Sequence, residues 1–350
     1  DDRVLSYLPL AHVFERAYIS TTTIIAATHV FFAESLDTFV DDLNRARPTL
    51  FISVPRLWLK FQLGVFKKLP EKKLNFLLKL PIISGLIKKK VLGGLGLDCV
   101  RLAGSGSAPI PADLIAWYRK LGLNLLEGYA MSEDYAYSHL STEDYNEPGY
   151  VGVPYAEVDV RISDTGEILI NSPGKMMGYY KAPELTVESF TEDGFFKTGD
   201  RGERREPSGL LKITGRVKEI FKTSKGKYVA PAPIENIINN HSSVELSCVS
   251  GTGRPQPYVQ LVVAEDLRDQ LDQSAVRDRI TAEMTQLLAV VNAKVEHHER
   301  LEFIVVSTSE WSISNDMLTP TMKIRRGAIE DATDAKVDAW YDAKQKVVWA

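Results

Sequence analysis

The stretch Val100-Arg-Leu-Ala-Gly-Ser-Gly-Ser-Ala-Pro109 predicts a strand that runs into a turn of small residues. Pro111–Leu121 is predicted to be a helix ended by Gly122, and Asn124–Leu126 a short strand that stops at Glu127-Gly128. A strand, a glycine turn, a helix and a strand in this order are typical of α/β folds. Ligands of such folds bind beyond the carboxyl ends of the strands, so the residues after these two strands are the first candidates for a site.

The segments on either side extend this pattern. Upstream, apolar runs predict strands at Val4–Leu8 and Leu50–Val54, with a helix at Leu36–Ala46 between them. Residues 134–206 carry fifteen acids against seven bases, with frequent Gly and Pro and short alternating runs, which predicts a small antiparallel barrel or sheet. Beyond them the pattern becomes mixed α+β, with a domain hinge expected around Arg216–Ile220. The elements expected there are helices at Ile234–Asn240, Ala275–Val291 and Arg326–Val337 and strands at Glu245–Ser250, Tyr258–Val263 and Phe303–Val306.

Composition limits the class of protein. The chain has 350 residues, 44% of them hydrophobic and 25% charged, which is typical of a globular protein of two domains and excludes a disordered chain or a disulfide scaffold. The net charge of −4 argues against a dedicated nucleic-acid binder. Cys99 and Cys248 match no zinc or disulfide spacing, which favours a reducing, cytoplasmic compartment. No run of about 18 apolar residues is present to span a membrane.

Residues 56–101 differ in charge from the rest of the chain. They hold eleven Lys and Arg against two acids, and their apolar residues recur at helical spacing. Basic amphipathic helices can lie on an anionic membrane surface, so the lysines of residues 60–90 are candidates for peripheral membrane association. A solvated face of ordinary helices, with lysines extended over apolar surface, explains the same pattern and is the favoured interpretation.

Four polar patches follow predicted strands or turns. Glu127-Gly-Tyr-Ala-Met-Ser-Glu133 combines an aromatic ring, a hydroxyl and a carboxylate, and Phe196-Lys-Thr-Gly-Asp200 places an acid after a glycine turn. Gly215–Pro231 is rich in lysine, and Leu318-Thr-Pro-Thr-Met-Lys-Ile-Arg-Arg326 places a lysine in a polar loop before a helix. Each patch alone has an ordinary explanation as a turn, a packing residue or a solvated lysine. Their order and spacing along one chain indicate a shared site.

In this order the motifs resemble those of the adenylate-forming acyl-CoA synthetases over essentially the whole chain, and most closely the long-chain fatty acyl-CoA synthetases. The similar stretches are Tyr7-Leu-Pro-Leu-Ala-His-Val-Phe-Glu-Arg16, Gly106-Ser-Ala-Pro109, Glu127–Glu133, Leu318–Lys323 and the basic insert at 56–101. The resemblance implies part of a large multi-layer α/β domain (1–148) with a small β-barrel subdomain (149–217), followed by a mobile α+β domain (218–350). It implies a ligase that uses ATP and Mg²⁺ to convert a fatty acid to acyl-AMP and then passes the acyl group to coenzyme A.

The resemblance also implies roles for single residues. In the first domain, these are Tyr129 stacked on adenine, Gly106, Glu127 and Gly128 beside the nucleotide, Ser132 (where the family has Thr) at the phosphate, Glu133 on Mg²⁺ and Asp200 on the ribose hydroxyls. Towards the second domain, they are Arg216 at the ribose or phosphate, Lys218 at the hinge, Lys222 near the nucleotide, and Gly226 and Tyr228 at the CoA entry. Lys323 would neutralise charge as the acyl carboxylate attacks the α-phosphate. His12 would gate or orient the acyl group, although a satisfied histidine at a strand end explains it as well.

The sequence departs from the family pattern at three places. The phosphate loop that normally precedes the Leu-Pro-Leu-Ala-His text is absent, and an apolar strand follows Asp1-Asp-Arg3 with nothing before it to pair with. We therefore expect the chain to be the C-terminal part of a longer protein. Ala130 stands where Gly is common, and Lys225 where a second Gly is frequent. Two other functions stay open: a ligase with another acyl or acceptor substrate, and a non-catalytic nucleotide- or acyl-binding module. A homodimer is also open.

Overall fold

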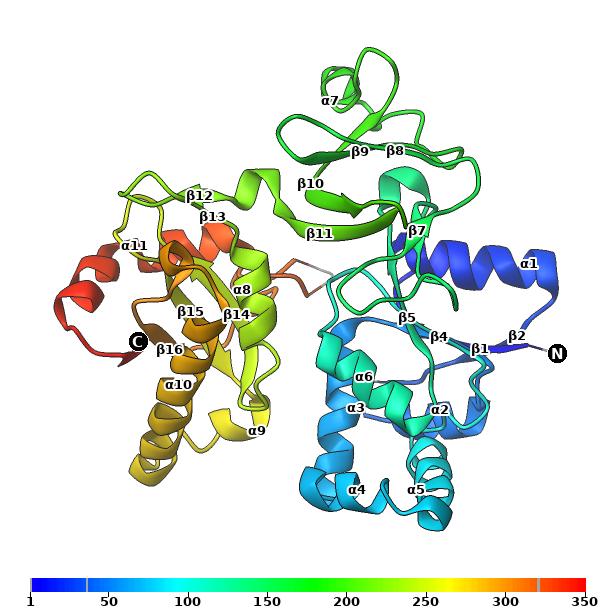
Figure 1. The fold of residues 1–350 in the computed structure, drawn as a ribbon, viewed down its shortest axis with the longest axis horizontal. Coiled ribbons are helices and arrows are strands. Elements are labelled where there is room, and N and C mark those ends of the chain that lie inside the picture. The colour runs from blue at the N-terminus through cyan, green and yellow to red at the C-terminus, as the bar shows by residue number, and fades with distance from the viewer. Residues whose placement is uncertain (1, 36, 320–321) are drawn as a thin grey trace. The chain divides into compact units, whose positions relative to one another are not determined.

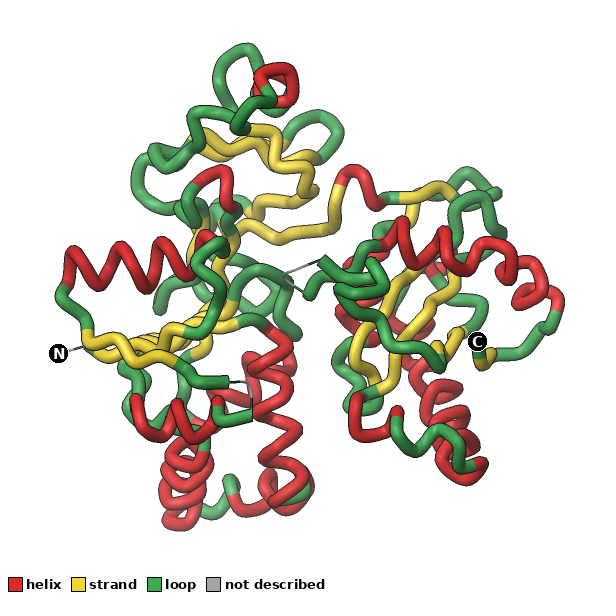
Figure 2. Tube along the Cα trace, turned by 180° about the vertical axis from the view of Figure 1, so that it is seen from behind, coloured by secondary structure: helices red, strands yellow, loops and turns green. Residues whose placement is uncertain are grey.

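The computed structural model describes residues 2–35, 37–319 and 322–350. The chain divides into two compact units, Asp1–Ile213 and Thr214–Ala350. Figures 1 and 2 show both units from opposite sides, and each unit is described by itself below. The predicted helix at Leu36–Ala46 begins at a residue outside the described ranges, and the structure has the helix at Phe39–Ala46.

The elements follow one another as a mixture of helices and strands in both units. The helices of the first unit are η1 (Glu15–Thr21, a π-helix), α1 (Thr22–Ala26), α2 (Phe39–Ala46), α3 (Pro55–Lys68), α4 (Glu71–Leu77), α5 (Pro81–Gly94), α6 (Ala112–Leu121), η2 (Ser132–Asp134) and α7 (Pro183–Glu188). The strands up to the boundary are β1 (Arg3–Ser6), β2 (His29–Phe32), β3 (Leu50–Ser53), β4 (Leu102–Ser105), β5 (Leu125–Tyr129), β6 (His139–Leu140), β7 (Val153–Pro154), β8 (Asp159–Ile162), β9 (Glu167–Asn171), β10 (Phe196–Arg205) and β11 (Leu210–Arg216). The remaining elements are η3 (Val217–Glu219), β12 (Phe221–Lys222), β13 (Tyr228–Val229), α8 (Pro231–Ile238), β14 (Val244–Ser250), β15 (Tyr258–Val263), α9 (Glu265–Arg268), α10 (Ser274–Lys294), η4 (His297–Glu299), β16 (Ile304–Ser307), α11 (Arg326–Asp342) and β17 (Val347–Trp349).

The first unit is built on a five-stranded sheet in the order β3-β4-β5-β6-β7. The strands β3, β4 and β5 are parallel, and β6 and β7 continue the sheet in antiparallel pairing. Parallel neighbours need long crossover connections, and here α3, α4 and α5 connect β3 to β4 while α6 connects β4 to β5. The three parallel strands therefore end at one edge, and the segments that follow them lie together there. This confirms the strand, turn, helix and strand predicted around residues 100–128.

An aromatic cluster fixes the helices on this sheet. Phe51, Trp58 and Tyr118 are each 2% exposed or less, and their rings meet edge to face. The Trp58 indole donates to the carbonyl oxygen of Gly104 at 3.1 Å, and the Tyr118 hydroxyl donates to the carbonyl oxygen of Trp58 at 2.7 Å. These bonds satisfy the polar atoms of two large buried rings, so the cluster contributes hydrophobic burial without an unpaired donor. Gly104 must be small, because a Cβ there would lie 3.0 Å from the Ile52 side chain.

The first unit also has a parallel two-stranded sheet, β1-β2, and a four-stranded sheet in the order β11-β10-β9-β8. β8 pairs with β9 and β9 with β10 in antiparallel register. The sequence predicted a small barrel or sheet here, and a β-barrel subdomain was implied. The structure has a four-stranded sheet here, and backbone hydrogen bonds from Val151 to Leu211 and from Leu211 to Gly152 join the segment before β7 to β11.

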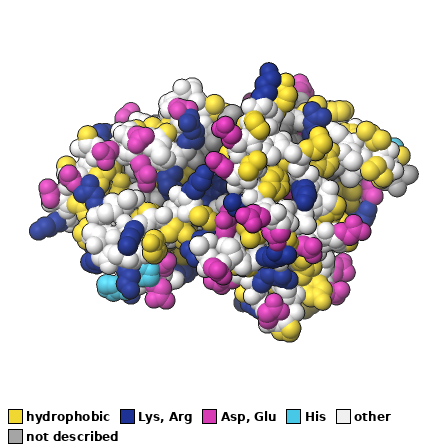
Figure 3. Space-filling view, turned by 90° about the horizontal axis from the view of Figure 1, so that it is seen from above, with side chains coloured by type: hydrophobic (Ala, Val, Ile, Leu, Met, Phe, Trp, Pro, Cys, Tyr) yellow, Lys and Arg dark blue, Asp and Glu magenta, His cyan; other side chains and the backbone are white. Residues whose placement is uncertain are grey.

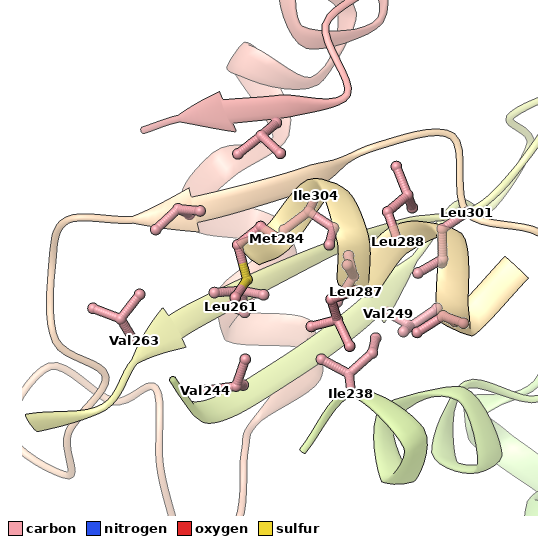
Figure 4. Close-up of a cluster of buried hydrophobic side chains, with 14 of the residues drawn as sticks. Ile238, Val244, Val249, Leu261, Val263, Met284, Leu287, Leu288, Leu301 and Ile304 are labelled. Carbon is pink, nitrogen blue, oxygen red and sulfur yellow. The ribbon is translucent and has the colours of Figure 1, made fainter. Parts of the chain in front are cut away.

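The second unit has the two-stranded β12–β13 sheet and a larger sheet in the order β14-β15-β16-β17. Helices cover both faces of the larger sheet. β15 has no solvent face: Val259, Leu261 and Val263 belong to one apolar cluster, while Tyr258 and Val262 belong to others. Figure 4 shows Met284, Leu287 and Leu288 of α10 packed over Leu261 and Ile304 on the first face. Side chains of α11 cover the opposite face, where Val337 and Trp340 pack with Tyr258. This unit has the predicted α+β character.

Some elements differ from their predicted bounds for local reasons. The helix predicted at Ile234–Asn240 begins at Pro231, because proline is tolerated in the first helical turn. The terminal helix continues to Asp342, five residues beyond the predicted end. The sequence did not predict η1, β2, α7 or the short β17, which are each seven residues or fewer.

The surface carries no extended field of one charge on the face that Figure 3 shows, where acidic and basic side chains are interspersed with apolar ones. Cys99 and Cys248 are both free thiols. No helix in the described part of the chain combines the length and the apolarity needed to cross a membrane.

Candidate functional site

The candidate site of the first unit lies where β4 and β5 end. The loop from Gly106 to Pro109 follows β4, and the segment from Tyr129 to Asp134 follows β5. The two approach closely at their glycines, since a Cβ on Gly106 would lie 3.6 Å from the carbonyl oxygen of Gly128. A Cβ on Gly128 would lie 3.4 Å from the carbonyl oxygen of His139, so Gly128 also permits the approach of β6. The predicted residues Gly106, Gly128 and Tyr129 are thus neighbours.

Tyr129 and Asp200 are joined by a hydrogen bond although 71 positions separate them in the sequence. The Tyr129 hydroxyl donates to Asp200 Oδ2 at 2.9 Å. Burial, and then the charge of Asp200, raise the pKa of Tyr129 well above its usual value, so the phenol stays a donor at neutral pH. The bond holds an aromatic ring beside a carboxylate at the carboxyl end of β5.

A bulge in β10 aims Asp200 at this position. The register of β10 against β9 shifts between Lys197 and Arg201, and Gly199 has a left-handed φ of 71°. The amide of Asp200 donates to Thr198 Oγ1 at 3.1 Å, and the Thr198 hydroxyl donates to the carbonyl oxygen of Ile168 at 2.7 Å. Bulges of this kind turn a side chain out of the regular pleat, and they occur often beside functional sites. Thr198 is therefore a supporting residue that the sequence did not identify.

His139 of β6 lies opposite Tyr129 in the antiparallel register. Its ring centroid is 5.9 Å from that of Tyr129, and its Nδ1 lies 2.8 Å from the hydroxyl of Ser138. Burial, and to a lesser degree the charge of Arg204, lower the pKa of His139 to about 3, so the imidazole is neutral. His139 therefore packs beside the tyrosine without adding positive charge.

Glu133 is held by a tyrosine that the sequence did not identify. It lies in η2, and its Oε1 accepts a hydrogen bond from the Tyr179 hydroxyl at 2.9 Å. The carbonyl oxygen of Glu133 accepts from the amide of Met176 at 2.7 Å. Ser132, the preceding residue, is exposed. No sequence signal links positions 133 and 179, because the contact is made only when the chain between them folds back.

Glu127 is in the interior rather than on an open surface. It is 5% exposed, and its Oε1 accepts a hydrogen bond from the amide of Ile110 at 3.3 Å, while Oε2 has no hydrogen-bond partner among the described residues. Burial raises the pKa of Glu127 to about 7. Its Cα pairs with that of Ser105 in the parallel register, so it shares a face with residues that pack on α6. Glu127 therefore lies at the end of the Gly106–Ile110 loop and holds it, and its expected contact with the nucleotide stays a prediction.

His12 lies against the same loop. Its Nδ1 accepts from the amide of Phe14 at 3.2 Å, and its Nε2 is 3.5 Å from the hydroxyl of Ser107. Ser107 itself has a left-handed φ of 69°, an uncommon conformation for a residue with a side chain. The histidine predicted near the acyl group is therefore beside the Gly106 loop, with both ring nitrogens near polar partners.

The second unit holds the other predicted residues in two places. Lys222 and Tyr228 face one another across the β12–β13 pair, with the Lys222 ammonium 5.5 Å from the Tyr228 ring centroid. Gly226 closes the turn between them with a left-handed φ of 78°, and Lys225 is not among the residues of positive φ. Arg216 ends β11 and Lys218 lies in η3, both exposed.

Lys323 closes a tight loop before α11. Its amide donates to Thr319 Oγ1 at 3.1 Å, and its carbonyl oxygen accepts from the amide of Thr319 at 2.8 Å. Leu318 and Ile324 form a bridge at the base of this loop, and Met322 has a left-handed φ of 62°. Two residues of the predicted motif, Pro320 and Thr321, lie outside the described residues.

Among the described residues, no three His, Cys, Asp or Glu side chains come together as a metal site. Glu133 is a single, partly exposed carboxylate beside an exposed hydroxyl. Mg²⁺ is commonly held by one or two carboxylates together with substrate phosphates, so this donor set fits a magnesium ion that arrives with a nucleotide.

Comparisons with known proteins show the family of the chain. The sequence model of the AMP-binding enzyme family matches residues 1–180, and that of the AMP-binding enzyme C-terminal domain matches residues 218–345. The chain belongs to the AMP-binding enzyme family.

Similar proteins are longer than this chain. The long-chain-fatty-acid–CoA ligase FadD15 of Mycobacterium bovis is 30% identical over 97% of the chain and 62% of its own length. Long chain acyl-CoA synthetase 3 of Arabidopsis thaliana is 28% identical over 99% of the chain and 59% of its own length. The A domain of a carboxylic acid reductase from Segniliparus rugosus, solved with AMP and a co-purified carboxylic acid, has the same fold with a TM-score of 0.76, at 24% identity over 98% of this chain and 55% of that one.

The buried carboxyl of Glu127 makes a pH prediction. Its pKa is about 7 in the folded protein against an ordinary 4.5, so the folded state binds more protons between these values and the free energy of unfolding falls as the pH rises through them. Glu127→Gln should remove this pH-dependent loss of unfolding free energy, which amounts to up to about 3 kcal/mol. Urea unfolding from pH 4.5 to pH 8 should show the variant gaining on the parent as the pH rises. Glu184→Gln on the exposed α7 should keep the parental slope, and a Glu127→Gln difference independent of pH would contradict the burial.

Proposed function

We propose that this protein acts in the ATP-dependent activation of a long-chain fatty acid to acyl-AMP, followed by thioester formation with coenzyme A. The contact that supports this most directly is the bond between Tyr129 and Asp200, because it places a ring suited to a base next to a carboxylate suited to ribose hydroxyls. The names of the similar ligases of Mycobacterium bovis and Arabidopsis thaliana support the long-chain substrate and CoA.

In the first half-reaction a carboxylate oxygen of the fatty acid attacks the α-phosphorus of ATP, and pyrophosphate leaves. Tyr129 stacks on the adenine, Asp200 accepts from the ribose hydroxyls, and Ser132 meets the phosphate. Glu133, oriented by Tyr179, would hold Mg²⁺, which when bound neutralises phosphate charge. Lys323 brings an ammonium to the charge that develops at the α-phosphate. Glu127 acts indirectly, by fixing the Gly106–Ile110 loop.

In the second half-reaction the sulfur of CoA attacks the acyl carbon, and AMP leaves. No side chain of the protein needs to act as nucleophile, since the carboxylate and the thiol are the attacking groups. The left-handed Gly226 lets a ligand approach the backbone between Lys222 and Tyr228, which suits a CoA entry. Arg216 and Lys218 precede this hairpin, and Lys218 is the residue about which we propose that the second unit reorients.

We also propose that residues 60–90 attach the protein to an anionic membrane surface. The exposed residues Ile82 and Leu86 are 87% and 68% exposed and lie one turn apart on α5, and Lys89 follows on the same face. Phe76 of the neighbouring α4 is 62% exposed. Apolar side chains beside lysines suit the boundary between lipid headgroups and acyl chains.

The nucleotide site can be tested with this chain alone. A non-hydrolysable palmitoyl-adenylate analogue lacks the β- and γ-phosphates, so its binding depends on the residues named above. Calorimetry should detect binding, weakened about ten- to a hundredfold by Asp200→Asn, because a charged acceptor of two hydroxyls is lost. Asp193 is an exposed acid that pairs with Arg161. The control variant Asp193→Asn should bind the analogue as tightly as the parent does.

Tyr129→Phe keeps the ring and removes only the hydrogen bond to Asp200. This variant should therefore lose less affinity for the adenylate analogue than Asp200→Asn does. Absence of binding by a cooperatively folded chain would favour a non-catalytic module. Tighter binding of an aryl- or short-chain adenylate than of the palmitoyl compound would favour a ligase with another acyl substrate.

The role of Lys323 separates the two half-reactions. In the full-length protein Lys323→Ala should slow acyl-AMP formation about a hundredfold or more, because its charge acts on the phosphorus that the carboxylate attacks. Thioester formation from supplied acyl-AMP should stay near the parental rate. Pyrophosphate release and acyl-CoA formation measure the two steps, and Lys336→Ala on the exposed side of α11 is the matched control. An equal loss in both steps would rule out the assigned role.

Membrane attachment makes an independent prediction. Replacing Lys88, Lys89 and Lys90 by alanine should weaken binding to phosphatidylserine-containing vesicles at low salt by up to about a hundredfold, since each lysine contributes about 1 kcal/mol at such a surface. Sedimentation with the vesicles measures it, with pure phosphatidylcholine as control. Ile82→Ser with Leu86→Ser should also weaken binding if apolar insertion contributes. Binding unchanged by the lysine substitutions would favour the solvated face of ordinary helices.

A further inference from the structure

The second unit contains a buried arginine, Arg326, that has no role in the proposed mechanism. Its side chain connects the segment directly after Lys218 with the segment of Lys323, and the mechanism uses both lysines. Arg326 is the first residue of α11, and its side chain is 11% exposed. Its guanidinium makes a two-pronged pair with Glu235 of α8, with Nη1 donating to Oε1 at 2.7 Å and Nη2 to Oε2 at 3.1 Å. Glu235 is itself only 9% exposed at its side chain, so this is an interior ion pair.

The same guanidinium reaches three further acceptors, of which the Cys248 sulfur lies 3.4 Å from Nη1. Nη1 donates to the carbonyl oxygen of Val249 in β14 at 2.7 Å, and the Val249 amide donates to Glu235 Oε1 at 2.7 Å. Nη2 donates to Glu219 Oε2 at 3.3 Å. Arg326 therefore connects α8, β14, η3 and α11 within the second unit. A planar fork with several donors can make these contacts at once, and a lysine ammonium cannot reproduce them.

These contacts attach both lysine-bearing segments to one core. Glu219 directly follows Lys218 in η3, and Arg326 follows Lys323 by three residues. The loop of Lys323 is fixed to the start of α11 by the Leu318–Ile324 bridge and by the bond from the Arg325 amide to the Met317 carbonyl oxygen at 2.8 Å. The guanidinium donates to residues of α8 and β14. Both elements contribute side chains to the main apolar cluster of the unit.

We propose that Arg326 is a positioning residue that makes the segment directly after Lys218 and the loop of Lys323 move as one body with the α8–β14 core. The bond to Glu219 ties the residue that directly follows Lys218 to this core. For the effect on catalysis the inference rests on the proposed function, because the two lysines matter to turnover only if they serve the two half-reactions. The coupling itself does not depend on the reaction.

Hydrogen exchange on the 350-residue chain tests the coupling. Arg326→Gln should speed exchange about tenfold in peptides covering 217–222, because Glu219 loses its charged hydrogen-bond partner. It should also do so in those covering 316–325, because the start of α11 loses its attachment to α8 and β14. Peptides covering β15 should exchange as in the parent. Arg325→Gln is the matched control: this arginine pairs with Asp316 outside the buried network, so peptides covering 217–222 should not change. A change in only one of the two segments, or a uniform rise that includes β15, would overturn the proposal.

Loss of Arg326 leaves Glu235 buried without its partner and can unfold the unit. Glu219→Ala avoids this, because it removes only the outer contact and leaves the pair with Glu235 in place. Exchange in 217–222 should rise about tenfold in this variant while 316–325 stays at the parental rate. An unchanged rate in 217–222 would overturn the tether.

Activity of the full-length protein tests the positioning role. Arg326→Gln should lower kcat in both half-reactions while KM for ATP stays within about twofold, because Tyr129 and Asp200, the proposed adenine and ribose contacts, belong to the first unit. Arg326→Lys should restore only part of the rate. Coupled exchange with undiminished half-reactions would overturn the positioning role. An inactive parent protein would instead count against the proposed function, and the exchange result would stand apart from it.

Discussion

The parallel pairing of β4 with β5 is the constraint on which the first unit depends. Because both strands run in the same direction, the loop after Ser105 and the segment after Tyr129 leave the sheet at the same edge. Glu127 of β5 then attaches the loop after Ser105 to β5, because its side chain accepts a hydrogen bond from the amide of Ile110. The bulge in β10 adds Asp200 from a separate sheet. The Tyr129 ring, the Asp200 carboxylate and the Gly106 loop can meet only because these backbone directions agree.

Two buried glutamates show opposite ways of placing a carboxyl group in the interior. Glu127 has one amide donor and an oxygen without a partner among the described residues, so burial keeps its pKa high. Glu235 is paired along both oxygens with Arg326 and accepts a backbone amide as well. An ion pair of this kind adds little net stability compared with apolar residues, but it specifies one arrangement because each partner is costly to leave alone. The first glutamate thus responds to pH, and the second orders its neighbours.

The sequence predicted the features that follow local rules. The strand, glycine turn and helix at 100–121 have strong punctuation, and the motifs around Tyr129, Asp200 and Lys323 have a recognisable order. Contacts between distant residues had no such signal: Tyr179 on Glu133 and Arg326 on Glu219 arise only from the folded chain. The burial of Glu127 had no signal either, since strand periodicity alone does not say which face of β5 is covered by α6. The roles of the site residues stay predictions.

The complete burial of β15 in the folded protein affects how the chain behaves when this strand is exposed. Tyr258–Val263 reads Tyr-Val-Gln-Leu-Val-Val, with no charge, proline or glycine, and every residue is buried between helices on both faces. Such uncharged six-residue segments of high β-propensity are the ones that stack into amyloid-like ladders when they are exposed. The helices α10 and α11 therefore do more than complete a core. They sequester a segment prone to self-association, and any opening of the second unit that bares this strand would turn a conformational change into a risk of aggregation.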